Sequence, residues 1–360
     1  MRSITGVGRD NTFDFLRLFA ALVVVLAHAQ FELRSELLWN ASQLFDGIGM
    51  FFVMSGFLVW QSAVSIERRT GSFRVYFQNR ALRILPGLYT YALLMPLVLV
   101  AVGAIPLQSL LTKDMLIWLG SAAFIVPGYD PAIWAQVGTG NMNGHLYTIP
   151  AEVSFYAVVP VLVLMARRWG FRWVVVALSA AAIAGPVLMF FLTGPITVAV
   201  HYTFLERAGY FLVGVFAAVY RERIVLSARA FVLALAAYFT LKIFGTGHDW
   251  FRVVQPLWLA APLGYCMLFF GYRGPKGLQR FTSWFGDLSY GTYIWHVLVV
   301  ELFVWAGWVG HWWQVLAVLC LSLAAAQISW RFIERPALGL KKDSSSRAAR
   351  ESSSVGPQAV

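Results

Sequence analysis

The first apolar stretch of the chain, residues 9–28, reads RDNTFDFLRLFAALVVVLAH. A helix needs about 20 mostly apolar residues to cross the hydrocarbon core of a bilayer, and this stretch comes close to supplying them. The whole chain has the same character: 59% of its 360 residues are hydrophobic, 12% are charged, and the mean hydropathy is +0.68. Soluble domains are roughly half apolar and a quarter charged, and disordered chains are more polar still. The composition therefore predicts an integral membrane protein.

Runs of similar length recur along the chain. The predicted spans are residues 13–30, 45–62, 84–104, 148–166, 173–192, 204–220, 226–244, 253–271, 287–308 and 313–333. Since only helices and closed barrels satisfy the backbone inside a bilayer, these runs predict an all-α fold, a polytopic transmembrane bundle of about ten spanning helices.

The distribution of basic residues predicts the orientation of these helices. Lys and Arg concentrate on the cytoplasmic side, and with the amino terminus inside most of the 28 basic residues fall there. This arrangement predicts that both termini lie in the cytoplasm. The basic clusters at 68–83 and 167–172 must both be inside, which makes the apolar stretch 115–126 a re-entrant or interfacial segment unless it adds a span. Residues 1–336 form the predicted membrane domain, and the Ser-rich residues 337–360 a disordered cytoplasmic tail.

Two ionisable side chains share one face of the first predicted helix. Arg17 and His28 are eleven residues apart, which is about 16 Å along a helix and about 20° past three full turns. An ionisable residue inside a span is a functional candidate, because burying it is costly unless it meets a partner or a cavity. Two other interpretations stay open. Both residues could be interfacial, with Arg17 extending its charged end to the membrane surface. Alternatively, cleavage of a signal peptide at Ala27-His28-Ala29 could remove the helix face that carries Arg17 and His28.

At several points the chain resembles the acyltransferase-3 family, multi-pass membrane enzymes that O-acylate bacterial glycans. The family signature of Arg or Lys, ten residues and then His is matched by Arg17 and His28. The other matching stretches are GMFFVMSGFLVW at 49–60, RALRILPGLY at 80–89, HLYTIPAEVSFYAVVPVL at 145–162, FGDLSYGTYIWH at 285–296 and FIERPA at 332–337. These stretches follow the family order over about residues 1–335. One departure is Tyr147, where the family pattern has Trp.

The basic residues near the inner membrane surface form a candidate cofactor site. Arg80 and Arg83 are spaced i, i+3, so on a helix they project from neighbouring positions. Guanidinium groups match phosphate oxygens in pairs, and acyl-CoA carries a pyrophosphate and a 3′-phosphate. We therefore expect Arg17, Arg80 and Arg83 to anchor acetyl-CoA or another acyl-CoA, and the resemblance implies the same for Arg80 and Arg83. Positive-inside topology alone is the simpler alternative.

The candidate catalytic residues lie near the outer third of the membrane. His28 is predicted as a general base on an acceptor hydroxyl, with Glu152 orienting its ring as a carboxylate does in acyl-transfer triads. A transient acyl-imidazole on His28 is not distinguished from direct transfer. A structural alternative for Glu152 is an ion pair with Arg207.

A third group of residues is assigned to the substrate channel. Ser55 and Gly56 would shape its middle, although a glycine there is also a common packing device. Ser289, Tyr293 and His296 follow a helical spacing along one face, which suits either an acceptor pocket or hydrogen bonds between helices. No metal-ligand motif is recognised, so no metal is expected.

Together with the family resemblance, these features predict a membrane-embedded O-acyltransferase, most simply an O-acetyltransferase. The resemblance also implies a location in the bacterial cytoplasmic (inner) membrane. It would move an acyl group from cytosolic acyl-CoA to a hydroxyl of a cell-surface glycan or glycolipid, with His28 as base. The expected partners are acyl-CoA, a glycan or lipid-linked sugar acceptor and membrane lipids, without nucleic acid. The alternative is a multi-pass transporter or flippase of a glycosylated or anionic substrate, which fits the buried charges but would more often show repeated halves.

Overall fold

The computed structural model describes residues 11–35, 44–125, 129–245 and 249–341, and the regular elements within these ranges are helices. The longer ones are α1 (Phe13–Glu32), α3 (Gly47–Thr70), α4 (Arg74–Ala101), α6 (Thr148–Trp169), α7 (Phe171–Phe191), α10 (Ala228–Gly245), α11 (Asp249–Arg273), α13 (Ser289–Trp305) and α14 (Trp312–Ser329). The shorter ones are α5 (Lys113–Ala123), α8 (Pro195–His201), α9 (Ala208–Tyr220), α12 (Lys276–Phe285) and α15 (Arg335–Gly339), with 3₁₀ turns at Leu107–Leu111, Ala132–Gln136 and Phe204–Arg207 and a π turn at Trp330–Glu334. The predicted all-α class is confirmed.

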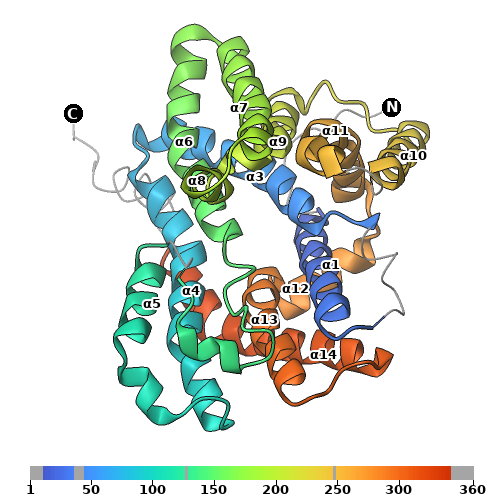
Figure 1. The fold of residues 1–360 in the computed structure, drawn as a ribbon. Coiled ribbons are helices and arrows are strands. Elements are labelled where there is room, and N and C mark those ends of the chain that lie inside the picture. Colours follow the sequence, from blue (N-terminus) through green and yellow to red (C-terminus); the bar gives the residue numbers. More distant parts are fainter. Residues whose placement is uncertain (1–10, 36–43, 126–128, 246–248, 342–360) are drawn as a thin grey trace, which may run out of the picture.

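Two groups of helices meet across α1 and α3 (Figure 1). In the view of that figure, α6, α7, α9, α10 and α11 lie in the upper half, and α4, α5, α13 and α14 lie in the lower half. Helix α3 packs closely along α9, while α1 packs along both α13 and α3. Helices α1 and α3 therefore link the two groups, and the surfaces they share with α4, α6 and α13 position the candidate site.

The number of membrane-crossing helices is close to the predicted ten. Within the described residues, eight helices are long and apolar enough to cross, and a ninth crossing results if α12 and α13, bent by 68° at their junction, count as one broken span. The predicted span 204–220 is the main difference. It forms a 3₁₀ turn followed by α9, whose 13 residues extend for about 20 Å, less than the hydrocarbon core.

The apolar stretch predicted at 115–126 lies largely in α5, and residue 126 falls outside the described residues. With 11 residues, α5 is about 16 Å long and too short to cross a bilayer by itself. It packs against α4 on the outside of the lower helix group (Figure 1).

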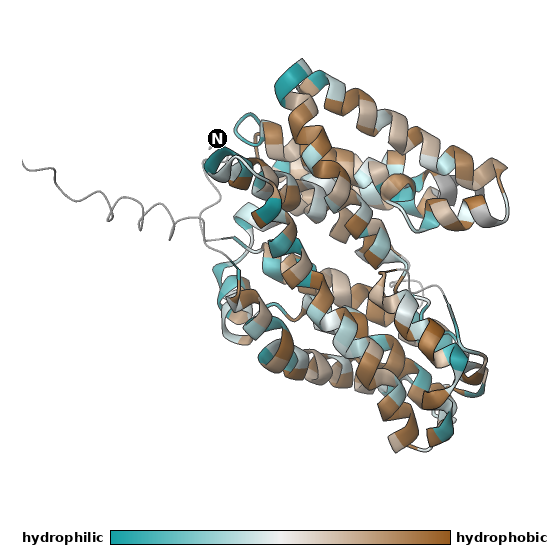
Figure 2. Ribbon diagram, turned by 90° about the vertical axis from the view of Figure 1, so that its left-hand side faces the viewer, coloured by the Kyte–Doolittle hydropathy of each residue, from teal (hydrophilic) through white to brown (hydrophobic). Residues whose placement is uncertain are grey.

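The outer surface of the bundle is apolar where lipid would cover it. Figure 2 shows hydrophobic residues along the helix surfaces and hydrophilic residues mainly at helix ends and turns. Leu233 on α10 is 71% exposed and Leu93 on α4 is 58% exposed, which in water would be unfavourable but suits contact with acyl chains.

Two chain reversals bring basic residues together at one end of the bundle. Helix α3 ends at Thr70, and the next residue, Gly71, adopts a left-handed conformation with φ 65°. This lets the chain turn back into α4, the helix that carries Arg80 and Arg83. The π turn after α14 and the short α15 lead the chain back toward α4, so that Lys341 reaches the same region. Residues 337–341 of the predicted tail are therefore described, whereas 342–360 lie outside the described residues.

Candidate functional site

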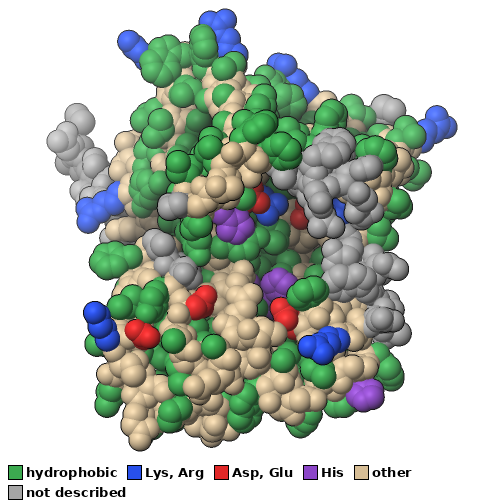
Figure 3. Space-filling model, viewed as in Figure 1, with side chains coloured by type: hydrophobic (Ala, Val, Ile, Leu, Met, Phe, Trp, Pro, Cys, Tyr) green, Lys and Arg blue, Asp and Glu red, His purple; other side chains and the backbone are tan. Residues whose placement is uncertain are grey.

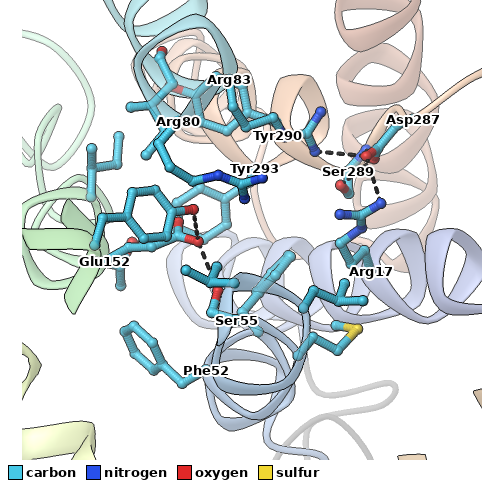
Figure 4. Close-up of a pocket in the computed structure, with 18 of the residues that line it drawn as sticks. Arg17, Phe52, Ser55, Arg80, Arg83, Glu152, Asp287, Ser289, Tyr290 and Tyr293 are labelled. Atoms are coloured by element: carbon cyan, nitrogen blue, oxygen red, sulfur yellow. Dashed lines mark hydrogen bonds and ion pairs between the residues drawn. The ribbon is translucent and has the colours of Figure 1, made fainter. Parts of the chain in front are cut away.

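A pocket with a cavity volume of about 280 Å³ lies between α1, α3, α4, α6 and α13 (Figure 4). Seven of the residues predicted from the sequence line it: Arg17, Ser55, Arg80, Arg83, Glu152, Ser289 and Tyr293. Its wall between the polar groups is apolar and includes Phe52 and Leu58. A deep cavity with an apolar wall and a few convergent polar groups is the usual form of a site for a cofactor-sized ligand.

Arg17 and Arg83 share one carboxylate at the pocket wall. Asp287 accepts from Arg83 at 2.6 Å and pairs with Arg17 at 3.1 Å, both through the same oxygen, Oδ2. Its other oxygen accepts from the Ser289 hydroxyl at 2.5 Å (Figure 4). Arg17 also pairs with Asp14, three residues earlier on α1. Asp287 lies in the stretch quoted for the family resemblance, but the sequence reasoning assigned it no role.

Arg80 differs from the other two arginines because the described residues give it no carboxylate partner. Its contacts are the Ser62 hydroxyl at 3.5 Å and the face of the Tyr156 ring, 5.6 Å from the ring centroid. Its buried Nε has no hydrogen-bond partner. Figure 4 shows its side chain extended into the pocket. A partly buried guanidinium with donors to spare suits an incoming anion, and of the three pocket arginines Arg80 is the one that no described carboxylate engages.

Lys341 is a fourth cation at the pocket, and the sequence reasoning missed it. It follows α15 and lies in a stretch whose composition predicts a disordered tail, so only the three-dimensional path of the chain reveals it. Partial burial and the nearby positive charges of Arg80, Arg83 and Arg17 together lower the pKa of Lys341 to about 8, although Asp287 acts in the opposite direction. The ammonium therefore loses its proton within an experimentally accessible pH range.

The predicted contact between Glu152 and His28 is replaced by other partners. Glu152 Oε1 accepts from the Ser55 hydroxyl at 2.7 Å and from the Tyr156 hydroxyl at 2.5 Å (Figure 4). Among the described residues, no hydrogen bond joins Glu152 to His28. The alternative ion pair with Arg207 is not formed either, because Arg207 pairs with Glu206 at 2.7 Å. Glu152 and Ser55 thus form a polar patch on the pocket wall, joined between α3 and α6.

His28 instead contacts a second histidine. His28 Nδ1 and His296 Nε2 are 2.7 Å apart, and the two rings stack with centroids 5.0 Å apart. A third ring, His145 in the turn before α6, meets His296 edge-on at 5.1 Å. Burial and the neighbouring His28 lower the pKa of His145 to about 3, so His145 stays neutral at physiological pH. His296 was predicted from the sequence as a channel residue, whereas the structure makes it the partner of the predicted base.

The common face predicted for Arg17 and His28 is confirmed. Helix α1 is continuous from Phe13 to Glu32, and it runs parallel to α13. Arg17 meets Asp287 just before α13 begins, and His28 meets His296 two turns into it. Arg17 and His28 therefore contact the two ends of one segment, residues 287–296.

A thin layer of side chains separates the pocket from the histidines. Ala21, Val24 and Tyr293 are buried together, with Ile48 and Phe51 packed against them. The Tyr293 hydroxyl donates to the backbone oxygen of His145 at 2.6 Å. Tyr293, Ile48 and Phe51 line the pocket, but His28 and His296 do not. The pocket lined by Tyr293, Ile48 and Phe51 therefore ends short of His28 and His296.

Gly56 does not line this channel. A Cβ placed on it would lie 2.5 Å from the backbone oxygen of Phe211 and 3.1 Å from Gly214, so it faces α9 rather than the pocket. The absence of a side chain allows α3 and α9 to pack closely, and this glycine is a packing device.

One face of the molecule is hollowed between the two helix groups. Figure 3 shows histidine, basic and acidic side chains in and around this hollow, with hydrophobic side chains inside it. Within the described residues, no group of three His, Cys, Asp or Glu side chains could hold a metal ion.

Comparison with known proteins places these residues in a family context. The family described as "Acyltransferase domain" matches residues 10–331. Nodulation protein 10 of Rhizobium leguminosarum bv. viciae is 29% identical, over 93% of this chain and 95% of its own length. An O-acetyl transferase of Shigella phage Sf6 is 24% identical, over 91% of this chain and 96% of its own length. A peptidoglycan O-acetyltransferase of Listeria monocytogenes is 21% identical, over 90% of this chain and 55% of its own length. No solved structure matches.

Proposed function

The chain belongs to the acyltransferase family that matches nearly its whole length, and from that premise we propose that it is an O-acetyltransferase of a cell-surface glycan or glycolipid. The donor is acetyl-CoA or another acyl-CoA taken from the cytoplasm. The relatives named as O-acetyltransferases support the class of reaction. The proposal places the protein in the bacterial inner membrane, with both termini and the basic end of the pocket in the cytoplasm.

The observation that supports this proposal most strongly is that four basic side chains line one deep pocket. Arg17, Arg80, Arg83 and Lys341 line a cavity whose far end reaches Tyr293, beneath the histidine pair. Phosphate groups of the donor would bind the cations at the cytoplasmic end, and the pantetheine arm would lie along the apolar wall. The arm is long enough to bridge the roughly 16 Å between Arg17 and His28.

The proposed reaction is direct transfer with His28 as general base. His28 removes the proton from the acceptor hydroxyl while the oxygen of that hydroxyl attacks the thioester carbonyl carbon. The new C–O bond forms, the C–S bond breaks, and the proton passes from His28 to the departing thiolate. The products are the acetyl ester and free coenzyme A, and His28 returns to its neutral form.

The layer of Val24, Phe51 and Tyr293 requires a side-chain movement before transfer. Because this layer stands between the pocket and His28, the thioester can meet the base only after Tyr293 or its neighbours move aside. Such a layer would keep water and the acceptor away from the donor site until an acyl group is bound.

Membrane vesicles containing the protein provide the test. Vesicles are incubated with acetyl-CoA labelled in its acetyl group, and the label is measured in the glycan and lipid-linked sugar fractions. We expect label in one of these fractions with the unchanged protein and none with His28→Ala. Full labelling by His28→Ala would refute the mechanism. Movement of a sugar across the vesicle membrane without any label would favour a transporter instead.

A further inference from the structure

Two hydrogen bonds run in series through the buried histidine pair. His296 Nδ1 lies 2.6 Å from the backbone oxygen of Tyr293, and His296 Nε2 lies 2.7 Å from His28 Nδ1. The first bond is local to α13 and joins residues three positions apart. His296 is fully buried, so no solvent competes for either of its nitrogens.

The direction of these bonds follows from their one fixed acceptor. A carbonyl oxygen cannot donate, so the Tyr293 oxygen requires the proton of a neutral His296 to be on Nδ1. His296 Nε2 then carries a lone pair and accepts, which requires His28 Nδ1 to donate. Nδ1 holds the only N–H of a neutral His28, and therefore Nε2 is left with its lone pair.

We propose that His296 is a positioning residue that holds His28 in the tautomer with a basic Nε2. It takes the place that the sequence suggested for the carboxylate of Glu152. Its catalytic consequence rests on the proposed function, whereas the tautomer is a property of the chain itself. When His28 accepts a proton on Nε2, its Nδ1–H stays bonded to His296, so the base needs no ring rotation during transfer.

The surroundings of the pair support a neutral relay. His145 Nε2 lies 3.0 Å from the backbone oxygen of Ile294, so this nitrogen also donates to a carbonyl. The nearest carboxylate on α13, Glu301, is bonded to the backbone N–H and hydroxyl of Thr139, each at 2.6 Å. Glu301 is thus engaged elsewhere, and His28 depends on His296 for its orientation.

The tautomer can be measured without an activity assay. The protein is labelled with ¹⁵N-histidine, reconstituted in lipid bilayers and studied by NMR, with His28→Gln used to identify the His28 signals. We expect an unprotonated Nε2 and a protonated Nδ1 for His28. A protonated Nε2 in the unchanged protein would overturn the inference, even if acetyl transfer is active. The expected tautomer without any acetyl transfer would instead count against the proposed function alone.

Substitutions at His296 test the catalytic consequence. His296→Leu removes the acceptor, and we expect kcat to fall by about a hundredfold with little change in the KM for acetyl-CoA, since general-base catalysis contributes about 10² to 10⁴. His296→Gln can donate to the Tyr293 oxygen and accept from His28, and we expect it to recover most of that loss. The matched control is Thr292→Val, because Thr292 is equally buried on α13 and its hydroxyl has no partner. Equal kcat losses in the Leu and Gln variants would contradict the positioning role.

Discussion

Arg80→Gln is the sharpest test of the donor site. Arg80 is the pocket arginine without a carboxylate partner among the described residues, so its removal leaves no protein charge newly unpaired. A hydrogen bond to a charged group contributes about 1.5 to 3 kcal/mol, which corresponds to a ten- to hundredfold change in affinity. We therefore expect the KM for acetyl-CoA to rise by about that factor while kcat stays near its original value.

Two companion variants make the Arg80 result interpretable. Arg68→Gln removes the same charge from an exposed position near the end of α3 and should leave the KM unchanged. Arg83→Gln should raise the KM too, but it also removes one of the two cationic partners of Asp287, so we expect a lower melting temperature as well. The assay is the initial rate of coenzyme A release at varied acetyl-CoA. An unchanged KM for Arg80→Gln would refute the phosphate assignment.

Three further predictions concern the pocket and its surroundings. Because the pKa of Lys341 is about 8 and only its charged form attracts phosphate, the KM for acetyl-CoA should rise as the pH increases through about 8. In Lys341→Gln the KM should be high and should not change over this pH range. An identical dependence of KM on pH in both proteins would exclude Lys341 from donor binding. Val24→Phe adds volume to the side-chain layer beneath His28, so kcat should fall at least about tenfold while the KM for the donor stays unchanged. An unchanged kcat would mean that the acyl group does not pass Val24. Gly56→Ala forces a Cβ against the backbone of Phe211 and should destabilise the protein by about 1 to 3 kcal/mol in thermal melts, and a neutral result would mean that α3 and α9 can separate freely.

Much of the fold could be predicted from the sequence, because length and hydropathy alone identify a membrane helix. The short α9 was the exception. Its apolar run of 204–220 includes Glu206 and Arg207, which pair with each other in a 3₁₀ turn instead of entering the helix. This ion pair thus lies outside the helix and leaves α9 shorter than the span predicted from mean hydropathy.

The candidate site was predicted in its parts but not in its pairings. Helical periodicity correctly placed Arg17 and His28 on one face, because that property depends on one helix alone. The partners of Glu152 and His28 depend on how α3, α6 and α13 are rotated against α1, and apolar helix surfaces leave little trace of that rotation in a single sequence. Lys341 was missed for a different reason, since a polar composition does not show where the chain returns.

The shared carboxylate of Asp287 has a consequence for how the donor site is occupied. Two guanidinium groups side by side at a membrane cavity would repel each other, and Asp287 acts as their counter-ion. An anion that binds these guanidinium groups must therefore compete with the carboxylate of Asp287. We expect a singly charged ion such as chloride to gain less free energy from that exchange than a molecule with several phosphate charges. On the proposed function, Asp287 would therefore favour a multiply charged donor over small anions at the Arg17–Arg83 pair.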